Sequence, residues 1–301
     1  MKLFNIYNFL FLFFFFLVLL GVNNCYSQNE GILWRITKSN LKDTSYLFGS
    51  NHTIEDTVLI PKIIKNTIIN STVFYQESKK ELFSNIKMIS ILFENGIKKN
   101  VKKIDTDQFN FLTRFCIDSL NIPQNRFNVL VKFRPMIIVS DIDKYANKKM
   151  NIFIKTYSID DKVRFIAIRN HLKIKGLEKT SELLEQMHLM SFYDEYQLYL
   201  GNIGHISVKD FIKKDEKYDY LQGRSFLCGK IEEMKDFELA CFSPMVMNRN
   251  FRWITEIEKS IQVEKVFISV GIGHILPEKY GLIDILRAKG YTVECILKEF
   301  K

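Results

Sequence analysis

The strongest constraint on the fold is a short apolar run, KVFISV (265–270), which stops at GIGH (271–274). A run of this length without regular alternation of apolar and polar residues is typical of a strand buried on both faces. Such a strand lies inside a sheet that carries helices on its two sides. The run therefore predicts a layered α/β protein.

Strand and helix patterns alternate toward both ends of the chain, while the middle is mainly helical. β-branched and aromatic runs predict strands at 32–37, 45–49, 71–77, 172–178, 265–270 and 291–297. Apolar residues at helical spacing predict helices at 61–70, 158–171, 179–202, 243–262 and 280–290. We therefore expect an α/β fold with a mixed, partly parallel sheet core flanked by helices. A mainly helical insertion is expected in the middle of the chain, at about 79–171.

The N-terminal segment has the features of a signal peptide. One basic residue, Lys2, precedes an apolar run of about 14 residues, which is short for a membrane span. Cys25 and Ser27 are small residues at the positions that precede a cleavage site. We expect 1–27 to be removed and 28–301 to form one exported domain, periplasmic, in the cell envelope or secreted. An uncleaved anchor and lipidation at Cys25 are the alternatives.

Charge and cysteine content exclude several classes of protein. The formal net charge is +9, but the lysines are spread among acidic residues and form no arginine-rich stripe, so no nucleic-acid partner is expected. No membrane span is expected beyond the signal segment. The other cysteines match no zinc pattern, and pairing of Cys228 with Cys241 is as open as buried free thiols. Those cysteines are Cys116, Cys228, Cys241 and Cys295.

One local pattern occurs twice, more than ~200 residues apart. SYLFGSNHT (45–53) and KVFISVGIGHIL (265–276) each break an apolar run at Gly and present a His three residues later. The glycines at 49, 271 and 273 are expected to take positive φ, which would turn the backbone sharply off each strand. Each histidine, His52 and His274, would then point over the end of its strand.

Four polar side chains are expected at the ends of predicted strands: His52, Glu77, Glu178 and His274. If these strands are parallel, the four side chains meet at one edge of the sheet, where α/β proteins place their sites. Two imidazoles and two carboxylates suit a divalent ion such as Mn, Zn, Co or Fe, and equally suit metal-free acid–base chemistry. A single Gly-x-x-His is weak evidence by itself, and either glutamate could serve as a capping or hinge carboxylate.

Several blocks, taken in order, resemble the TraB/PrgY/GumN family, a Tiki-like metalloprotease superfamily. The resemblance spans nearly all of residues 31 to 297. The blocks are LWRI (33–36), SYLFGSNHTIED (45–56), PKIIKNTIINSTVFYQES (61–78), KIKGLEKTSELLEQ (173–186), MNRNFRWITEIEK (247–259) and VFISVGIGHILPEKYGLIDILRAKGYTVE (266–294).

The resemblance implies an exported metal-dependent hydrolase, a peptidase acting on a peptide or protein with a divalent ion such as Mn, Co or Zn. Its catalytic and metal-binding residues would be His52, Glu77 and His274. Glu178, Arg249 and Asn250 lie in matching blocks and are candidate additional site residues. The first motif reads GSNH where GTIH is more usual, which leaves loss of catalysis open. The alternative is a haem- or peptide-binding protein on the same scaffold without turnover.

Overall fold

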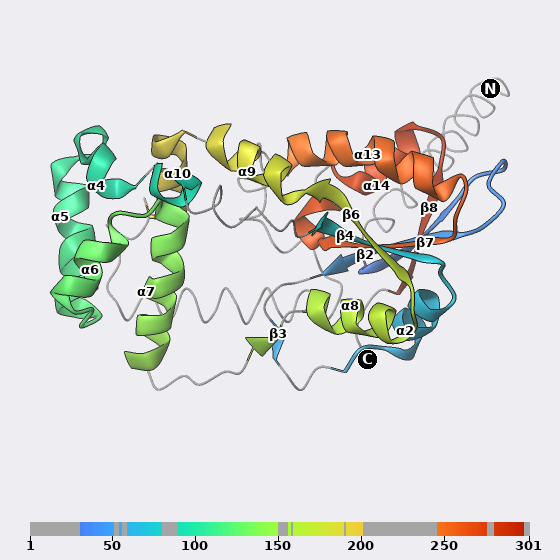
Figure 1. Ribbon diagram of the computed structural model, residues 1–301, viewed down its shortest axis with the longest axis horizontal. Coiled ribbons are helices and arrows are strands. Elements are labelled where there is room, and N and C mark those ends of the chain that lie inside the picture. Colours follow the sequence, from blue (N-terminus) through green and yellow to red (C-terminus); the bar gives the residue numbers. More distant parts are fainter. Residues whose placement is uncertain are drawn as a thin grey trace, which may run out of the picture.

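The computed structural model contains a six-stranded sheet with helices on both faces and a helical cluster to one side (Figure 1). His52, the N-terminal segment, Cys228 and Cys241 lie outside the described residues. Among the helices of the described ranges, none combines the length and the apolar character that a membrane crossing requires. The described residues are 31–50, 54–55, 59–79, 90–94, 96–149, 156–157, 159–189, 191–200, 246–275 and 280–297.

The sheet is mixed, with a parallel centre and an antiparallel side. Its strand order is β6-β4-β7-β2-β1-β8. β7 runs parallel to β2 and β4, β4 runs parallel to β6, and β1 is antiparallel to both β2 and β8. This confirms the expected α/β class. The strands are β1 (Leu33–Thr37), β2 (Ser45–Ser50), β4 (Val73–Lys79), β6 (Lys173–Lys179), β7 (Val266–Gly271) and β8 (Thr292–Leu297).

β7 is the central strand that its sequence predicts. All six of its residues are buried, because β2 and β4 cover its two edges and helices cover both of its faces. Phe267 stacks on Phe74 of β4 with a ring-centroid distance of 5.7 Å. β7 therefore lies between the hairpin β1–β2 and the strands β4 and β6, which carry Glu77 and Glu178.

Helices cover both faces of the sheet (Figure 1). Their apolar residues, such as Ile64, Val163, Trp253 and Leu286, join the strands in one core cluster. α14 ends as predicted, with Gly290 in the left-handed region at φ 82°. On one face lie α2 (Lys62–Ile69) and α8 (Ile159–Arg169), and on the other lie α13 (Met247–Ile261) and α14 (Leu282–Ala288).

The middle of the chain forms a helical cluster with an apolar core of its own, built from residues such as Leu112, Phe127 and Ile138. The helices are α4 (Ile97–Asn100), α5 (Thr106–Arg114), which continues into a π-helical turn (Phe115–Ser119), α6 (Gln124–Leu130), α7 (Pro135–Lys149) and α10 (Phe192–Tyr199). A two-stranded sheet of β3 (Ile54–Glu55) and β5 (Thr156–Tyr157) lies outside this cluster.

The single long helix expected at 179–202 is two helices in the structure, α9 (Thr180–Leu189) and α10. α9 begins where β6 ends, whereas α10 packs on α7. Buried Glu195 of α10 accepts hydrogen bonds from Nε of Arg134 at 2.9 and 2.8 Å. The structure therefore divides a stretch whose sequence pattern is helical on both sides of the break.

The expectation of positive φ at the motif glycines is wrong. Within the described ranges, positive φ at glycine occurs at Gly31 and Gly290, and Gly271 has φ −55°. Gly49 is required for a different reason, since a Cβ added there would lie 2.2 Å from Cδ1 of Ile272. The missing side chain allows the turn after β7 to pack directly on β2, so the two motifs touch.

Candidate functional site

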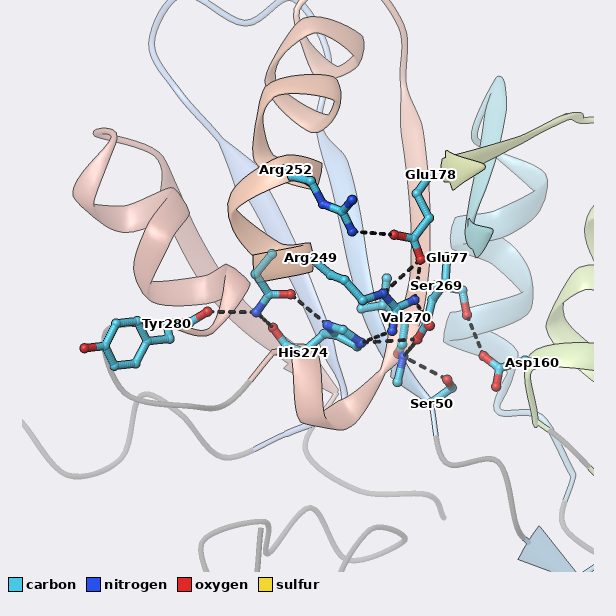
Figure 2. Close-up of polar contacts among 12 residues, drawn as sticks. Ser50, Glu77, Asp160, Glu178, Arg249, Arg252, Ser269, Val270, His274 and Tyr280 are labelled. Carbon is cyan, nitrogen blue, oxygen red and sulfur yellow. Dashed lines mark hydrogen bonds and ion pairs between the residues drawn. The ribbon is translucent and has the colours of Figure 1, made fainter. Parts of the chain in front are cut away.

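The carboxyl edge of the parallel strands gathers acidic and basic side chains (Figure 2). Glu77 comes from β4, Glu178 from β6, and His274 from the short 3-10 turn Ile272–His274 directly after β7. β4 extends to Lys79, two residues further than expected, yet the parallel pairing still brings these side chains together. Neighbouring parallel strands end at the same edge of a sheet, which explains the convergence.

Arg249 of α13 lies at the centre of this group and is buried. Its Nε and Nη2 donate to Oε1 of Glu178 at 2.9 and 2.6 Å. Nη2 also donates to Oε2 of Glu77 at 2.7 Å, and Nη1 lies 3.1 Å from Nε2 of His274. One planar guanidinium therefore joins three segments that are distant in sequence, a geometry suited to its rigid fork of donors.

Asn250 determines the orientation and tautomer of His274. Its Nδ2 donates to the backbone oxygens of His274 and Tyr280 at 2.9 and 2.7 Å, which uses both amide hydrogens. Its Oδ1 must therefore accept the hydrogen bond from Nδ1 of His274, 2.8 Å away. In the neutral ring, Nε2 then carries the lone pair and faces Arg249 and Glu77.

Trp253 forms one wall of the site, one helical turn beyond Arg249 on α13. Its ring centroid is 4.4 Å from that of His274, and Cζ of Arg249 lies 4.5 Å from the Trp253 ring. Residues 249, 250 and 253 share the buried side of α13. The sequence interpretation did not include Trp253, although its spacing from Arg249 on an amphipathic helix was a usable signal.

Glu77 is held as a carboxylate. Burial by itself would raise the pKa of Glu77, but the positive charge that His274 carries when its ring is protonated, the charge of Arg249 and the Gly271 N–H together lower it from 4.5 to about 2. The Gly271 N–H donates to Oε1 at 2.7 Å, while Oε2 accepts from Arg249. The side chain is therefore ionised at neutral pH and is a weak proton acceptor.

Glu178 is more enclosed than Glu77 and has two arginine partners. Its side chain is 2% exposed, and Nη2 of Arg252 donates to its second oxygen at 3.2 Å. Arg252 itself is 37% exposed at the rim. One buried carboxylate, Glu178, and one partly buried carboxylate, Glu77, thus face two guanidinium groups, which satisfies the requirement that buried charges be paired. The sequence interpretation did not include Arg252.

A hydroxyl connects the ends of β2 and β7. Oγ of Ser50, which is buried, donates to the backbone oxygen of Val270 at 3.1 Å (Figure 2). On the other side of the same strand, Oγ of Ser269 lies 3.4 Å from Asp160. The first motif, which continues to His52 outside the described residues, is therefore attached to the strand that carries the second motif.

Comparison with known proteins supports the resemblance drawn from the sequence blocks. The model of the TraB/PrgY/gumN family matches residues 32–295. The chain belongs to this family. The matched region contains both Gly-x-x-His motifs and the segments that bring Glu77, Glu178 and Arg249 together. No curated protein and no solved structure gives a significant match.

The resemblance implies a metal ion, and the geometry of the described residues shows how far they could hold one. Nε2 of His274 and Oε1 of Glu77 are 3.8 Å apart, within the ~4 Å that two ligands of one ion can span at ~2.1 Å each. Asn250 on Nδ1 is the kind of partner that orients metal-bound histidines. Within the described ranges, no three His, Cys, Asp or Glu side chains group closely enough to hold an ion.

The described residues therefore supply at most two donors for such an ion, and one of them, Nε2 of His274, is already hydrogen-bonded. Nη1 of Arg249 donates to the same Nε2 lone pair that a metal would use, so this hydrogen bond must break. The other Arg249 bonds, to Glu178 and to Oε2 of Glu77, do not involve that lone pair. The other histidine that the resemblance implies, His52, lies outside the described residues.

Proposed function

We propose that this chain is an exported metal-dependent hydrolase that cleaves peptide bonds in a peptide or protein substrate. The observation that supports it best is the pairing of Nε2 of His274 with Oε1 of Glu77 at 3.8 Å, from two matched family blocks. A metal-dependent hydrolase needs only a few protein ligands for its ion. Histidine and glutamate are both common ligands of Mn, Co and Zn.

His52, Glu77 and His274 would hold the proposed ion. When bound, such an ion would polarise the scissile carbonyl and lower the pKa of a bound water to ~7. Glu77 contributes a permanent negative charge, since its pKa is lowered to about 2. A carboxylate that binds protons so weakly is a poor general base, so we assign it to ion binding.

Arg249 and Asn250 complete the proposed site. Asn250 keeps the Nε2 lone pair of His274 directed at Glu77, as derived from its hydrogen bonds. Arg249 supplies a fixed positive charge at the point where negative charge develops on the scissile oxygen, which stabilises the transition state. The burial of this charge increases its effect, because the surroundings have a low dielectric constant.

The test is metal analysis and peptide cleavage with the purified 28–301 chain. His52→Ala, His274→Ala and Glu77→Gln should each lower cleavage by more than ~100-fold and reduce the bound metal. His188→Ala is the matched control, since His188 is an exposed histidine paired with Glu94 at 2.9 Å. Equal cleavage in the wild type and in the two site-histidine variants would refute the proposal.

A binding protein on this scaffold would give a different pattern in the same experiment. Tight peptide binding without cleavage, or a haem absorption change that His274→Ala abolishes, would replace the hydrolase proposal. Export is tested separately by N-terminal sequencing of the protein from the producing cells. We expect the mature chain to begin at Gln28.

A further inference from the structure

The outer surface of the helices α2 and α8 keeps large apolar side chains exposed to solvent. The two helices pack against each other on the face of the sheet opposite α13 (Figure 1). Within the described ranges, half of the exposed large apolar side chains lie on these helices or just before α2, with exposed fractions from 44 to 81%. They are Leu59, Ile69, Phe165 and Ile168. Apolar side chains gathered on neighbouring helices indicate a contact surface, whereas single scattered ones do not.

The helical repeat explains why the sheet cannot bury these side chains. In α8, Val163 and Ala167 are buried in the core, while Phe165 and Ile168 project away from it. In α2, the residues at 64, 67 and 68 are buried, and Ile69 at the end of the helix is exposed. One side of each helix already serves the core, so the exposed apolar residues are available to a partner.

Basic side chains accompany the apolar ones. The exposed positions of α2 and α8 include four basic residues and a single acidic one, Asp161, in the first turn of α8. No carboxylate of the described ranges forms an ion pair with any of the four. The positive charge of this surface is therefore not balanced there. The basic residues are Lys62, Lys65, Arg164 and Arg169, and together with Ile69, Phe165 and Ile168 we call them the α2–α8 surface.

Phe165 and Arg169 are one helical turn apart on α8 and are in contact. Cζ of Arg169 lies 4.5 Å from the centre of the Phe165 ring, and both side chains are exposed. Lysine and arginine can lay their apolar stems along such a surface while the charged end stays among polar groups. The pair therefore offers an apolar group and a positive charge to the same partner.

A partner of the α2–α8 surface must present negative charge and an apolar layer together. An anionic membrane does so everywhere, because its headgroup phosphates lie directly above the acyl chains. A nucleic-acid duplex presents phosphates but has no apolar layer that could accept Phe165 and Ile168. The combination of side chains on the outer side of the two helices therefore favours a lipid surface.

We propose that the α2–α8 surface docks on an anionic lipid membrane. The three apolar side chains enter the boundary between headgroups and acyl chains, and the four basic side chains contact the headgroups. The contact is peripheral and reversible, and it involves neither end of the chain. Because α13, which carries Arg249, lies on the opposite face of the sheet, this inference goes beyond the proposed function and does not depend on it.

The test is co-sedimentation of the purified 28–301 chain with lipid vesicles at about 0.1 M salt. This chain contains every described residue and lacks the apolar N-terminal run, which would bind vesicles by itself. One set of vesicles is phosphatidylcholine alone, and the other contains phosphatidylcholine and phosphatidylglycerol in equal amounts. The wild type should bind the anionic vesicles more tightly, and raising the salt to about 0.5 M should weaken this binding.

Charge reversal tests the position of the basic residues. Lys65→Glu combined with Arg164→Glu should weaken binding to the anionic vesicles by more than about 20-fold, since each basic side chain contributes about 5-fold. Lys98→Glu combined with Lys99→Glu is the matched control, because these exposed lysines of α4 give the same change in net charge elsewhere. The control should stay within about 3-fold of the wild type.

An apolar substitution tests whether side chains enter the membrane. Phe165→Ser should weaken binding about 5-fold, whereas Tyr193→Ser, which replaces a 56% exposed aromatic residue of α10, should leave it unchanged. Thermal unfolding checks that each variant folds. If Phe165→Ser does not fold, Ile168→Ser is measured in its place and should also weaken binding.

Several results would overturn the proposal. The wild type might bind both kinds of vesicle equally, or the α4 control might weaken binding as much as Lys65→Glu with Arg164→Glu. Binding that depends on charge but is unaffected by Phe165→Ser, with equal affinity for duplex DNA, would assign the surface to nucleic acid. A wild-type dimer that Phe165→Ser separates, without vesicle binding, would assign it to a second copy of this chain.

Discussion

Acidification should destabilise the fold through Glu77. The pKa of Glu77 is lowered from 4.5 to about 2 in the folded chain, so its stabilising contribution is complete above pH 4.5 and is lost as the pH falls toward 2. At 1.36 kcal/mol for each pKa unit, this difference corresponds to about 3 kcal/mol in the free energy of unfolding. The side chain is 23% exposed, so solvent screening makes this an upper value.

The measurement is urea unfolding of the wild type and Glu77→Gln at pH 7, 5, 4 and 3, with linear extrapolation to water. At pH 7 the variant should be about 2–3 kcal/mol less stable, and its stability should fall less between pH 5 and 3. Glu294→Gln is the control, because Glu294 also pairs with an arginine, at 2.6 Å, but is 50% exposed. The control should lose less than about 1 kcal/mol.

The deciding comparison is how steeply the free energy of unfolding changes with pH in the wild type and in Glu77→Gln. Other carboxylates contribute to the acid sensitivity of every variant, so the informative quantity is the difference between the wild type and Glu77→Gln. If both proteins lose stability in parallel between pH 5 and 3, Glu77 is not held ionised by His274, Arg249 and Gly271, and this account of the site is wrong.

Three further substitutions, the last with a compensating second change, test the packing of the site and of the helical cluster, each by urea unfolding. Asn250→Ala removes three hydrogen bonds of a buried side chain and should cost about 3 kcal/mol, and a loss below about 1 kcal/mol would contradict its orienting role. Glu195→Gln leaves buried Arg134 without its counter-charge and should cost about 3–5 kcal/mol. Gly49→Ala should cost about 1–3 kcal/mol by overpacking, and Ile272→Val, which removes the clashing Cδ1, should restore much of it.

Much of the architecture could be predicted from local pattern. The uninterrupted run in β7 predicted a strand covered on both faces, and all six of its residues are buried. The hairpin β1–β2 and the end of α14 at Gly290 were also predictable, because turn residues and glycine act locally. The break between α9 and α10 was not predicted; in the structure α9 follows β6 directly, whereas α10 packs on α7.

The candidate site was predictable in part. Glu77, Glu178 and His274 could be placed together because each follows or ends a run of strand-forming residues and the strands are parallel. The hydrogen bonds of Arg249 to Glu77, Glu178 and His274 could not be predicted, because they depend on how α13 crosses the sheet. The predicted role of the motif glycines is wrong, since Gly49 serves close packing and does not have a positive φ.

The amino-acid sequence by itself determined the α/β class, the central strand and the family to which the chain belongs. Periodicity and motif order carry that information, because they reflect interactions between residues close in the chain. Only the tertiary structure decided which nitrogen of His274 is available, that Glu77 is ionised, and that Arg249 shares the Nε2 lone pair. These properties arise from distances and burial between segments up to about 200 residues apart, which local pattern does not encode.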